Sequence, residues 1–184
     1  GLQRMRAGLV RPGIQALVEV SGRNISTIQA SDLGFTVGPR INAAGRLDDM
    51  SFGIHCLLSK DTLSAGKMAL ELDTLNKARR EIEQGIQAEA EVILSSLTFE
   101  EGQAPKALAL FQPEWHQGVI GIVAGRLKEK FNRPTIVFAS ADDGDIYSDD
   151  SEIKGSARSI TGVHIRDLLD AIDKKYPELI EKFG

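Results

Sequence analysis

The sequence predicts an α/β fold in which one long helix connects a helical region to a small domain with a sheet. Residues 1–60 contain short helical patterns separated by turn signals. Residues 64–98 carry a continuous apolar stripe without proline, which is typical of a single amphipathic helix. Residues 104–184 show the order strand, helix, strand, strand, helix, which is typical of an α/β layer.

The first region alternates turn signals with short helical patterns. The turn signals are Arg11–Gly13, Ser21–Asn24 and Gly38–Pro39, and Ile14–Val20 has a helical pattern. Ser31–Gly34 suits a turn or the start of a helix. These residues therefore predict several short helices.

The long helix is the strongest secondary-structure prediction. At about 1.5 Å per residue, more than thirty residues extend on the order of 50 Å, which is too long for the interior of a compact domain. We therefore expect a helix that connects two parts of the protein. Its apolar stripe consists of Met68, Leu72, Leu75, Ile82, Ile86, Ile93 and Leu97.

The third region contains three strand patterns and two helix patterns. The strands are predicted at Ala107–Phe111, Pro134–Ala139 and Ile153–Ile160. The helices are predicted at Val119–Phe131 and from Ile165 to about Lys174.

Composition places the chain among globular proteins that bind no membrane. Hydrophobic residues make up 42% and charged residues 26% of the 184 residues. No apolar run reaches the roughly 18 residues of a membrane span. The single cysteine, Cys56, excludes an internal disulfide, indicates a cytoplasmic protein, and is expected to be buried in its apolar run. Because an initiator methionine is missing, we expect a fragment of a longer protein.

The net charge of −4 argues mildly against nucleic-acid binding by bulk electrostatics. Six acids, however, fall within Asp142–Glu152, and the rest of the chain is slightly basic. We interpret this acidic run as a solvated loop, because its spacing does not match a calcium-binding loop.

The segment Gly38–Asp49 combines two glycines, small alanines and two arginines six residues apart, Arg40 and Arg46. Small residues allow another chain to approach closely, and an arginine fork suits a phosphate or a carboxylate. The alternative is a helix that packs through its alanines, with its arginines paired to Asp48 and Asp49.

The segment Pro113–Gly121 leads from a strand into a helix and contains two glycines. Free backbone N–H groups at a helix N-terminus favour an anion. His116, beside the chain's only tryptophan, Trp115, is therefore a candidate functional residue. The alternatives are a structural histidine and a tryptophan that fills the core.

The segment Lys154–Ile160 places small hydroxylated residues around one arginine, an arrangement that could surround a phosphate. The alternative is a hairpin strand with an exposed arginine. The candidate phosphate ligands in and after this segment are Ser156, Arg158, Ser159, His164 and Arg166.

The sequence contains no metal-binding cluster. Its three histidines lie far apart, and it has no Ser-His-Asp signature, P-loop or Gly-x-Gly-x-x-Gly motif. We therefore expect that the chain binds no metal and activates no water by itself.

Four segments, taken in order, resemble the bacterial RecJ single-strand DNA exonucleases of the DHH phosphoesterase superfamily. They are Ser31–Phe35 continuing to Arg40–Met50; Glu71–Asp73 with Asn76 and Arg80–Glu83; Pro113–Val119; and Gly155–Ser159.

The resemblance implies a fold and an activity. Residues 1–60 would be the C-terminal part of a DHH domain, 64–98 the connecting helix, and 104–184 an incomplete DHH-associated domain with a mixed sheet. Such enzymes degrade single-stranded DNA from its 5′ end to mononucleotides in repair and recombination. Their two-metal centre of Mn²⁺ or Mg²⁺ lies upstream of the matched segments, so the fragment alone is expected to be inactive.

The resemblance also implies roles for individual residues. Arg40, Asn42 and Arg46 would line the substrate cleft, Trp115 and catalytic His116 would face the scissile bond, and Ser156, Arg158 and Ser159 would hold a phosphate. The partners would be single-stranded DNA and, in repair, a single-strand-binding protein or a helicase.

The chain departs from the family in three respects. The family's Gly-Gly-His motif and its OB-fold are absent, and the acidic run is longer. Two alternatives stay open: a phosphoesterase for short oligonucleotides or a phosphorylated small molecule, and a non-catalytic module that binds single strands or a protein.

Overall fold

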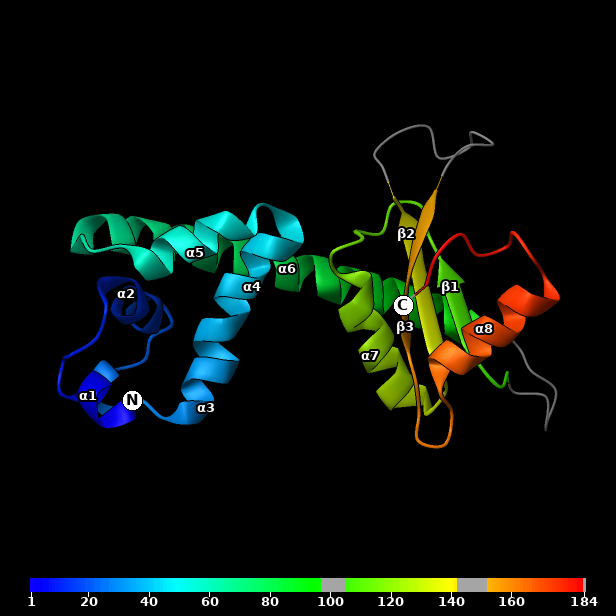
Figure 1. The fold of residues 1–184 in the computed structure, drawn as a ribbon, viewed down its shortest axis with the longest axis horizontal. Helices are drawn as coiled ribbons and strands as arrows, with labels where there is room; N and C mark the ends of the chain where they lie inside the picture. Colours follow the sequence, from blue (N-terminus) through cyan, green and yellow to red (C-terminus); the bar gives the residue numbers. More distant parts are fainter. Residues whose placement is uncertain (97–104, 142–151, 184) are drawn as a thin grey trace. The chain divides into compact units, whose positions relative to one another are not determined.

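The structure is a computed structural model that describes residues 1–96, 105–141 and 152–183. The chain divides into two compact units, Gly1–Glu81 and Ile82–Gly184, and the long helix α6 contributes residues to both (Figure 1). The acidic run, expected to be a solvated loop, lies almost entirely outside the described residues.

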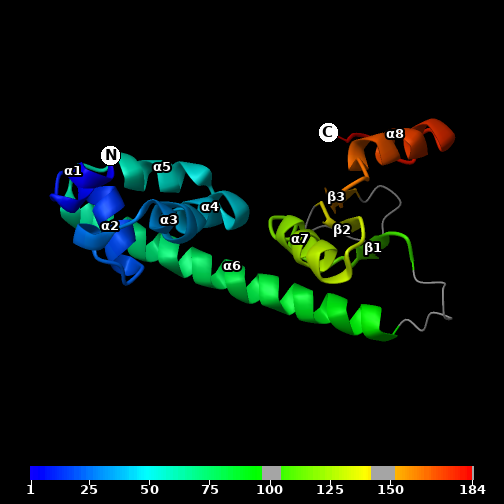
Figure 2. The ribbon, with the colours of Figure 1, turned by 90° about the horizontal axis from the view of Figure 1, so that it is seen from below.

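The unit Gly1–Glu81 is helical, as predicted. Side chains with strong capping preferences fix where its helices begin: Asp49 accepts the N–H of Ser51, and Asp61 accepts the N–H of Ser64. Figure 2 shows the short helices beside the first part of α6. Its elements are α1 Leu2–Arg6, α2 Pro12–Val20, the 3-10 helix Ile25–Thr27, α3 Ala30–Asp32, the π-helix Leu33–Val37, α4 Gly38–Leu47, α5 Met50–Leu58 and the first part of α6 Thr62–Ser96.

The core of this unit lies between α2, α5 and α6. Leu17, Cys56 and Leu72, one from each helix, are fully buried. Burial also raises the pKa of the Cys56 thiol. The prediction of a buried, unpaired cysteine is confirmed.

The unit Ile82–Gly184 contains a mixed three-stranded sheet, which confirms the predicted fold class. The strand order is β1-β2-β3, with β1 parallel to β2 and β2 antiparallel to β3. Its elements are the last part of α6, β1 Leu108–Phe111, α7 Ile120–Phe131, β2 Thr135–Ser140, β3 Ile153–Arg158 and α8 Ile165–Lys175. Each predicted strand and helix of this region is present, with shifts of a few residues at the ends.

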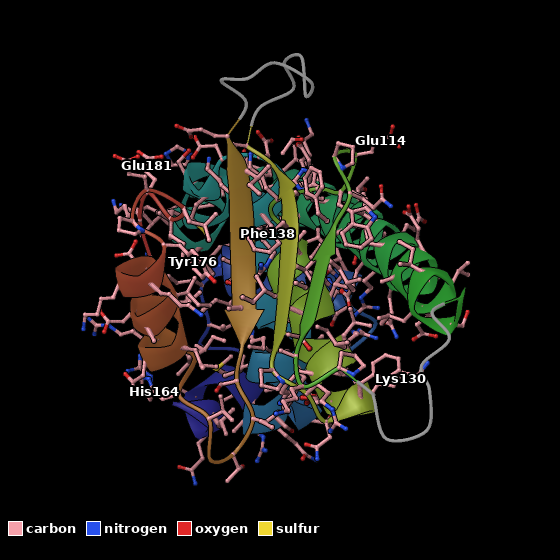
Figure 3. All side chains as sticks on the ribbon, turned by 90° about the vertical axis from the view of Figure 1, so that its right-hand side faces the viewer. Glu114, Lys130, Phe138, His164, Tyr176 and Glu181 are labelled. Carbon is pink, nitrogen blue, oxygen red and sulfur yellow. The ribbon has the colours of Figure 1, made fainter. Side chains whose placement is uncertain are left out.

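Helix α7 covers one face of the sheet. Alternate residues of β1 and β2, including Leu110 and Val137, are buried on this face together with Val123 of α7. Helix α8 lies beside β3 at the edge of the sheet, on the side away from α7 (Figures 1 and 2). Figure 3 views the sheet from that side, where Phe138 extends over Gly155 of β3.

Ion pairs and hydrogen bonds hold α7 and the loop before it against the last part of α6. Arg126 pairs with the buried Glu83, and Lys130 lies 2.7 Å from Glu91. These ion pairs join α7 to the last part of α6. Within the described ranges, no helix is both long and apolar enough to cross a bilayer.

Candidate phosphate-binding site

The first turn of α7 and the strand β3 meet at Gly121. A Cβ atom at Gly121 would lie 2.8 Å from Ser156 Oγ and 3.0 Å from Arg158 Nη2. The absence of a side chain at Gly121 therefore allows the hydroxyl and the guanidinium to reach the helix N-terminus. Two segments that the sequence presented as separate candidates thus form one cluster.

Strand register explains why Ser156 and Arg158 reach α7. Ser156 pairs with Val137 and Arg158 pairs with Thr135, and both partners point to the sheet face that α7 covers. Because residues two apart on a strand share a face, Ser156 and Arg158 point to the same side. The sheet therefore presents both side chains to the helix.

The guanidinium of Arg158 folds back along β3. Its Nη1 donates to the carbonyl of Ala157 at 2.8 Å and lies 3.5 Å from Ser156 Oγ. The arginine is exposed, and no carboxylate among residues 1–96, 105–141 and 152–183 pairs with it. Its remaining N–H groups are therefore available to an anion.

The N-terminus of α7 adds a second source of positive potential. No side chain caps this helix, although the first-turn amides of Ile120 and Ile122 already donate to the carbonyls of His116 and Val119. The partial positive charge at this end of the helix favours an anion. Together, the partial positive charge of the helix end and the two donors, the Ser156 hydroxyl and the Arg158 guanidinium, suit a phosphate.

His116 orients the loop that leads into α7. Its Nδ1 accepts the N–H of Gly118 at 3.0 Å, and its carbonyl accepts the N–H of Val119 at 2.9 Å. With Nδ1 as an acceptor, the neutral ring carries its proton on Nε2, which can donate to a bound group. The catalytic role of His116 stays a prediction.

Trp115 anchors this loop in the core. Its side chain is only 5% exposed, and its Nε1–H donates to Glu89 of α6 at 2.8 Å. On the other side of the loop, the Gln117 amide donates to the carbonyl of Ala141 at 3.1 Å. Trp115 therefore holds the loop in place, and its contact with the substrate stays a prediction.

Ser159, His164 and Arg166 lie beyond the end of β3. The Ser159 hydroxyl donates to the carbonyl of Val163 and so closes the turn after β3. His164 occupies the N-cap position of α8, with Nδ1 3.3 Å from Asp167, and Arg166 is exposed in the first turn. Among the described residues, no hydrogen bond or ion pair joins these three to Arg158.

Arg40, Asn42 and Arg46 lie on α4 in the other unit. Asn42 and Arg46 are exposed, whereas Arg40 is nearly buried. Arg40 donates to Asp73 of α6 from Nε at 2.9 Å and to the carbonyl of Thr36 at 2.7 Å.

This pairing corrects one alternative drawn from the sequence. The prediction that α4 packs through its alanines is confirmed, since Ala43 and Ala44 are fully buried. The partner of Arg40 is Asp73, however, and not Asp48 or Asp49. The Asp49 carboxylate instead caps α5, because it lies at the start of that helix.

Asp73 also pairs with Lys77 at 2.9 Å. Burial raises the pKa of Asp73, but the hydrogen bonds and positive charges of Lys77 and Arg40 together hold the pKa below its usual value. The buried Asp73 is therefore a charged carboxylate at neutral pH.

Within the described part of the chain, no three His, Cys, Asp or Glu side chains are grouped so that they could hold a metal ion. The cluster at Gly121, Ser156 and Arg158 can bind and orient a phosphate without one.

Three acidic residues hold other side chains in place, although no role could be assigned to them from the sequence: Asp73, Glu83 and Glu89. They interact with Arg40, Arg126 and Trp115, respectively. The sequence does contain a pattern that could have indicated such residues: Asp73, Asn76 and Glu83 are polar residues at spacings of three and seven on a predicted helix. All three are buried in the structure.

Known proteins match the whole chain. A family model described as DHHA1 domain matches residues 104–184. The single-stranded-DNA-specific exonuclease RecJ of Salmonella typhimurium is 53% identical over 100% of this chain and 31% of its own length. That of Bacillus subtilis is 34% identical over 90% of this chain and 20% of its own length.

Solved structures agree with these relatives. The crystal structure of RecJ from Thermus thermophilus in complex with Mg²⁺ matches with a TM-score of 0.77 and 30% identity, covering 100% of this chain and 26% of that one. A structure of exonuclease RecJ bound to manganese matches with a TM-score of 0.71 and 31% identity, covering 92% of this chain and 38% of that one. The chain is therefore similar along its whole length to one segment of these RecJ exonucleases, and its residues 104–184 match the DHHA1 domain model.

Proposed function

We propose that this chain is the strand-holding part of a single-stranded-DNA-specific exonuclease that works from the 5′ end. The observation that carries the proposal is the cluster at Gly121, where Ser156 and Arg158 meet the N-terminus of α7. Its charge and donors suit the 5′-phosphate group of the strand. The chain would act in the cytoplasm, as part of DNA repair and recombination.

The relatives support this proposal. The proteins from Salmonella and Bacillus are single-stranded-DNA-specific exonucleases by name, and the chain spans 31% of the length of the Salmonella protein. The activity of the whole enzyme is therefore assigned to a longer protein of which this segment supplies the phosphate contacts.

The residues of this chain would bind and orient the substrate. Arg158 and Ser156 would donate to phosphate oxygens, and the first-turn amides of α7 would add to the positive potential. His116 would direct its Nε2–H toward the bound group, while Trp115 keeps the loop in place. Mn²⁺ or Mg²⁺, held by residues outside this chain, would supply the activation of water.

The first test is the variant Arg158→Ala. We expect 5′-phosphorylated single strands to bind about 10- to 100-fold more weakly, because a charge-assisted contact is worth roughly 1.5–3 kcal/mol. Fluorescence anisotropy with a labelled oligonucleotide measures the affinity. The control Lys175→Ala removes an exposed cation of α8 and should leave the affinity nearly unchanged.

Comparison of 5′-phosphorylated with 5′-hydroxyl strands separates a phosphate site from general electrostatics. We expect Arg158→Ala to abolish the preference for the 5′-phosphate. An equal loss for both kinds of strand, or no loss at all, would contradict the proposed site.

The second test is Gly121→Ala, which fills the space between α7 and β3. The new Cβ would displace the ends of two flexible side chains, Ser156 and Arg158, so the fold should tolerate it. Alanine also favours a helix by up to about 1 kcal/mol over glycine. We therefore expect equal or higher thermal stability together with weaker binding of 5′-phosphorylated strands.

Gly125→Ala is the matched control for this prediction. Gly125 lies on the same helix, and among the described residues no atom outside this helix lies within 4 Å of the position that its Cβ would take. It should change helix propensity in the same direction without touching the site. Equal affinity of the two alanine variants would show that the contact at Gly121 does not matter for binding.

A further inference from the structure

A basic hollow lies on the surface of the unit Gly1–Glu81. Its volume is about 520 Å³, and three of its lining residues are cations: Arg4 of α1, Arg11 before α2, and Lys60 between α5 and α6. We propose that this hollow is a second phosphate site that holds a phosphodiester group of the nucleic-acid strand. The inference rests on the proposed function, because the ligand of the hollow is the single strand named there.

The backbone around the hollow is fixed by a helix C-cap. Gly8, at φ +79°, ends α1, with the N–H of Gly8 bonded to the carbonyl of Met5 and that of Leu9 bonded to the carbonyl of Arg4, both at 2.9 Å. Only a residue that tolerates this left-handed conformation can turn the chain here. The turn holds Arg4 and Arg11 at the same opening.

The three cations have no acidic partner that would neutralise them. Within the described ranges, no hydrogen bond or ion pair engages the side chains of Arg4, Arg11 or Lys60, and all three are exposed. By contrast, Arg6 donates to the carbonyl of Ile28 at 2.8 Å and belongs to the fold. The hollow therefore carries three positive charges that the fold itself does not use.

Acidic residues are absent from this part of the sequence. The first eighteen residues contain three arginines and no acid. Asp61 follows Lys60, but its carboxylate accepts the N–H of Ser64 at 2.7 Å and caps α6. Since no acid lines the hollow, its net potential favours an anion.

The start of α2 adds to this potential. Pro12 lies in the first turn, and the N-cap residue Arg11 has no side-chain acceptor for the first-turn amides. The positive end of the nine-residue helix thus lies where Arg11 and Pro12 line the hollow. The Ser59 hydroxyl donates to the carbonyl of Asp61, so recognition depends on the three cations.

The shape of the hollow selects among phosphate ligands. It is open and shallow, and its cations come from three separate segments of the chain. An open basic surface suits the backbone of a strand that passes over it, whereas a free nucleotide would need an apolar enclosure for its base. We therefore take the phosphodiester backbone as the source of the phosphate.

The test is the double variant Arg4→Gln with Lys60→Gln in the 184-residue chain. Binding of a 5′-hydroxyl oligothymidylate is measured as a function of salt concentration. Because this oligonucleotide has no 5′-phosphate, the Arg158 site makes no 5′-phosphate contact with it. For a single strand, each phosphate contact contributes roughly −0.7 to the slope of log K against log salt concentration. We expect the slope to flatten by about 1.4 and the affinity at low salt to fall about 10-fold.

The control is the double variant Arg23→Gln with Lys67→Gln. It removes two exposed cations of the same unit that do not line the hollow, so net charge changes equally. Circular dichroism and thermal melting confirm that both variants fold. Equal slopes for the two double variants would overturn the inference, even where Arg158→Ala abolishes the 5′-phosphate preference and the proposed function stands.

NMR titration separates failure of this inference from failure of the proposed function. We expect oligothymidylate to shift the amide signals of Gly8 and Lys60 in the unaltered chain and not in the double variant. If inorganic phosphate shifts these signals and the oligonucleotide does not, the nucleic-acid source is overturned. If neither shifts them, the hollow is not a phosphate site.

Discussion

Replacing Gly13 by alanine is expected to destabilise the unit Gly1–Glu81 by at least about 3 kcal/mol. A Cβ at this position would lie 1.9 Å from the carbonyl oxygen of Cys56 and 3.1 Å from the Cα of Leu57. These are backbone atoms of α5 that cannot rotate away. Helices α2 and α5 would therefore have to separate, which would expose buried residues such as Leu17.

Urea unfolding followed by circular dichroism measures this effect, and Gly66→Ala provides the control. Gly66 lies in α6 of the same unit, and no atom of the described residues outside α6 lies within 4 Å of its Cβ position. The control should gain up to about 1 kcal/mol from helix propensity. Similar unfolding midpoints for the two variants would show that α2 and α5 do not approach as closely as described.

Gly13 also shows where a local interpretation of the sequence is wrong. The patterns Arg11–Gly13 and Gly38–Pro39 predict turns that separate helices, yet Pro12 and Gly13 begin α2, and Gly38 and Pro39 begin α4. Proline is common in the first helical turn because its missing N–H has no partner there in any case. Ser21–Asn24, in contrast, does include a turn, and Gly22 has a φ of +74°.

Periodicity is sufficient to predict the long helix and the order of strands and helices between 105 and 183. These features depend on residues a few positions apart, so the sequence carries them directly. The same applies to the glycines before α7 and the small residues around Arg158, which local chemistry marks as candidates. Sequence alone does not show that Gly121 touches Ser156 and Arg158.

Contacts between distant residues could not be predicted, because they depend on how helices and strands pack. The partner of Arg40 lies 33 residues away, and the partner of the Trp115 indole lies 26 residues away. Nearby acids at Asp48 and Asp49 made a local pair for Arg40 plausible. In the structure, Arg40 instead pairs with Asp73, a polar residue on the buried side of α6. The apolar pattern of a helix does not indicate such a residue.

The variant Asp73→Asn should therefore have the second large effect. Arg40 would keep its buried position but lose its charged partner, and removing one member of a buried pair costs about 3–5 kcal/mol. Lys77→Ala removes the other, exposed partner of Asp73 and should cost no more than about 0.5 kcal/mol. The free energy of unfolding of each variant in urea measures the difference.

The effect of Asp73→Asn should also depend on pH, in a direction that the lowered pKa of Asp73 determines. A carboxyl group with a lower pKa in the folded state stabilises the protein above its unfolded pKa of about 3.9, and this contribution is lost as the pH falls through the folded value. The difference in unfolding free energy between the unaltered chain and the variant should be constant near neutral pH and shrink below about pH 4. A difference that stays the same on acidification would show that the negative charge of Asp73 is not what stabilises the buried Arg40.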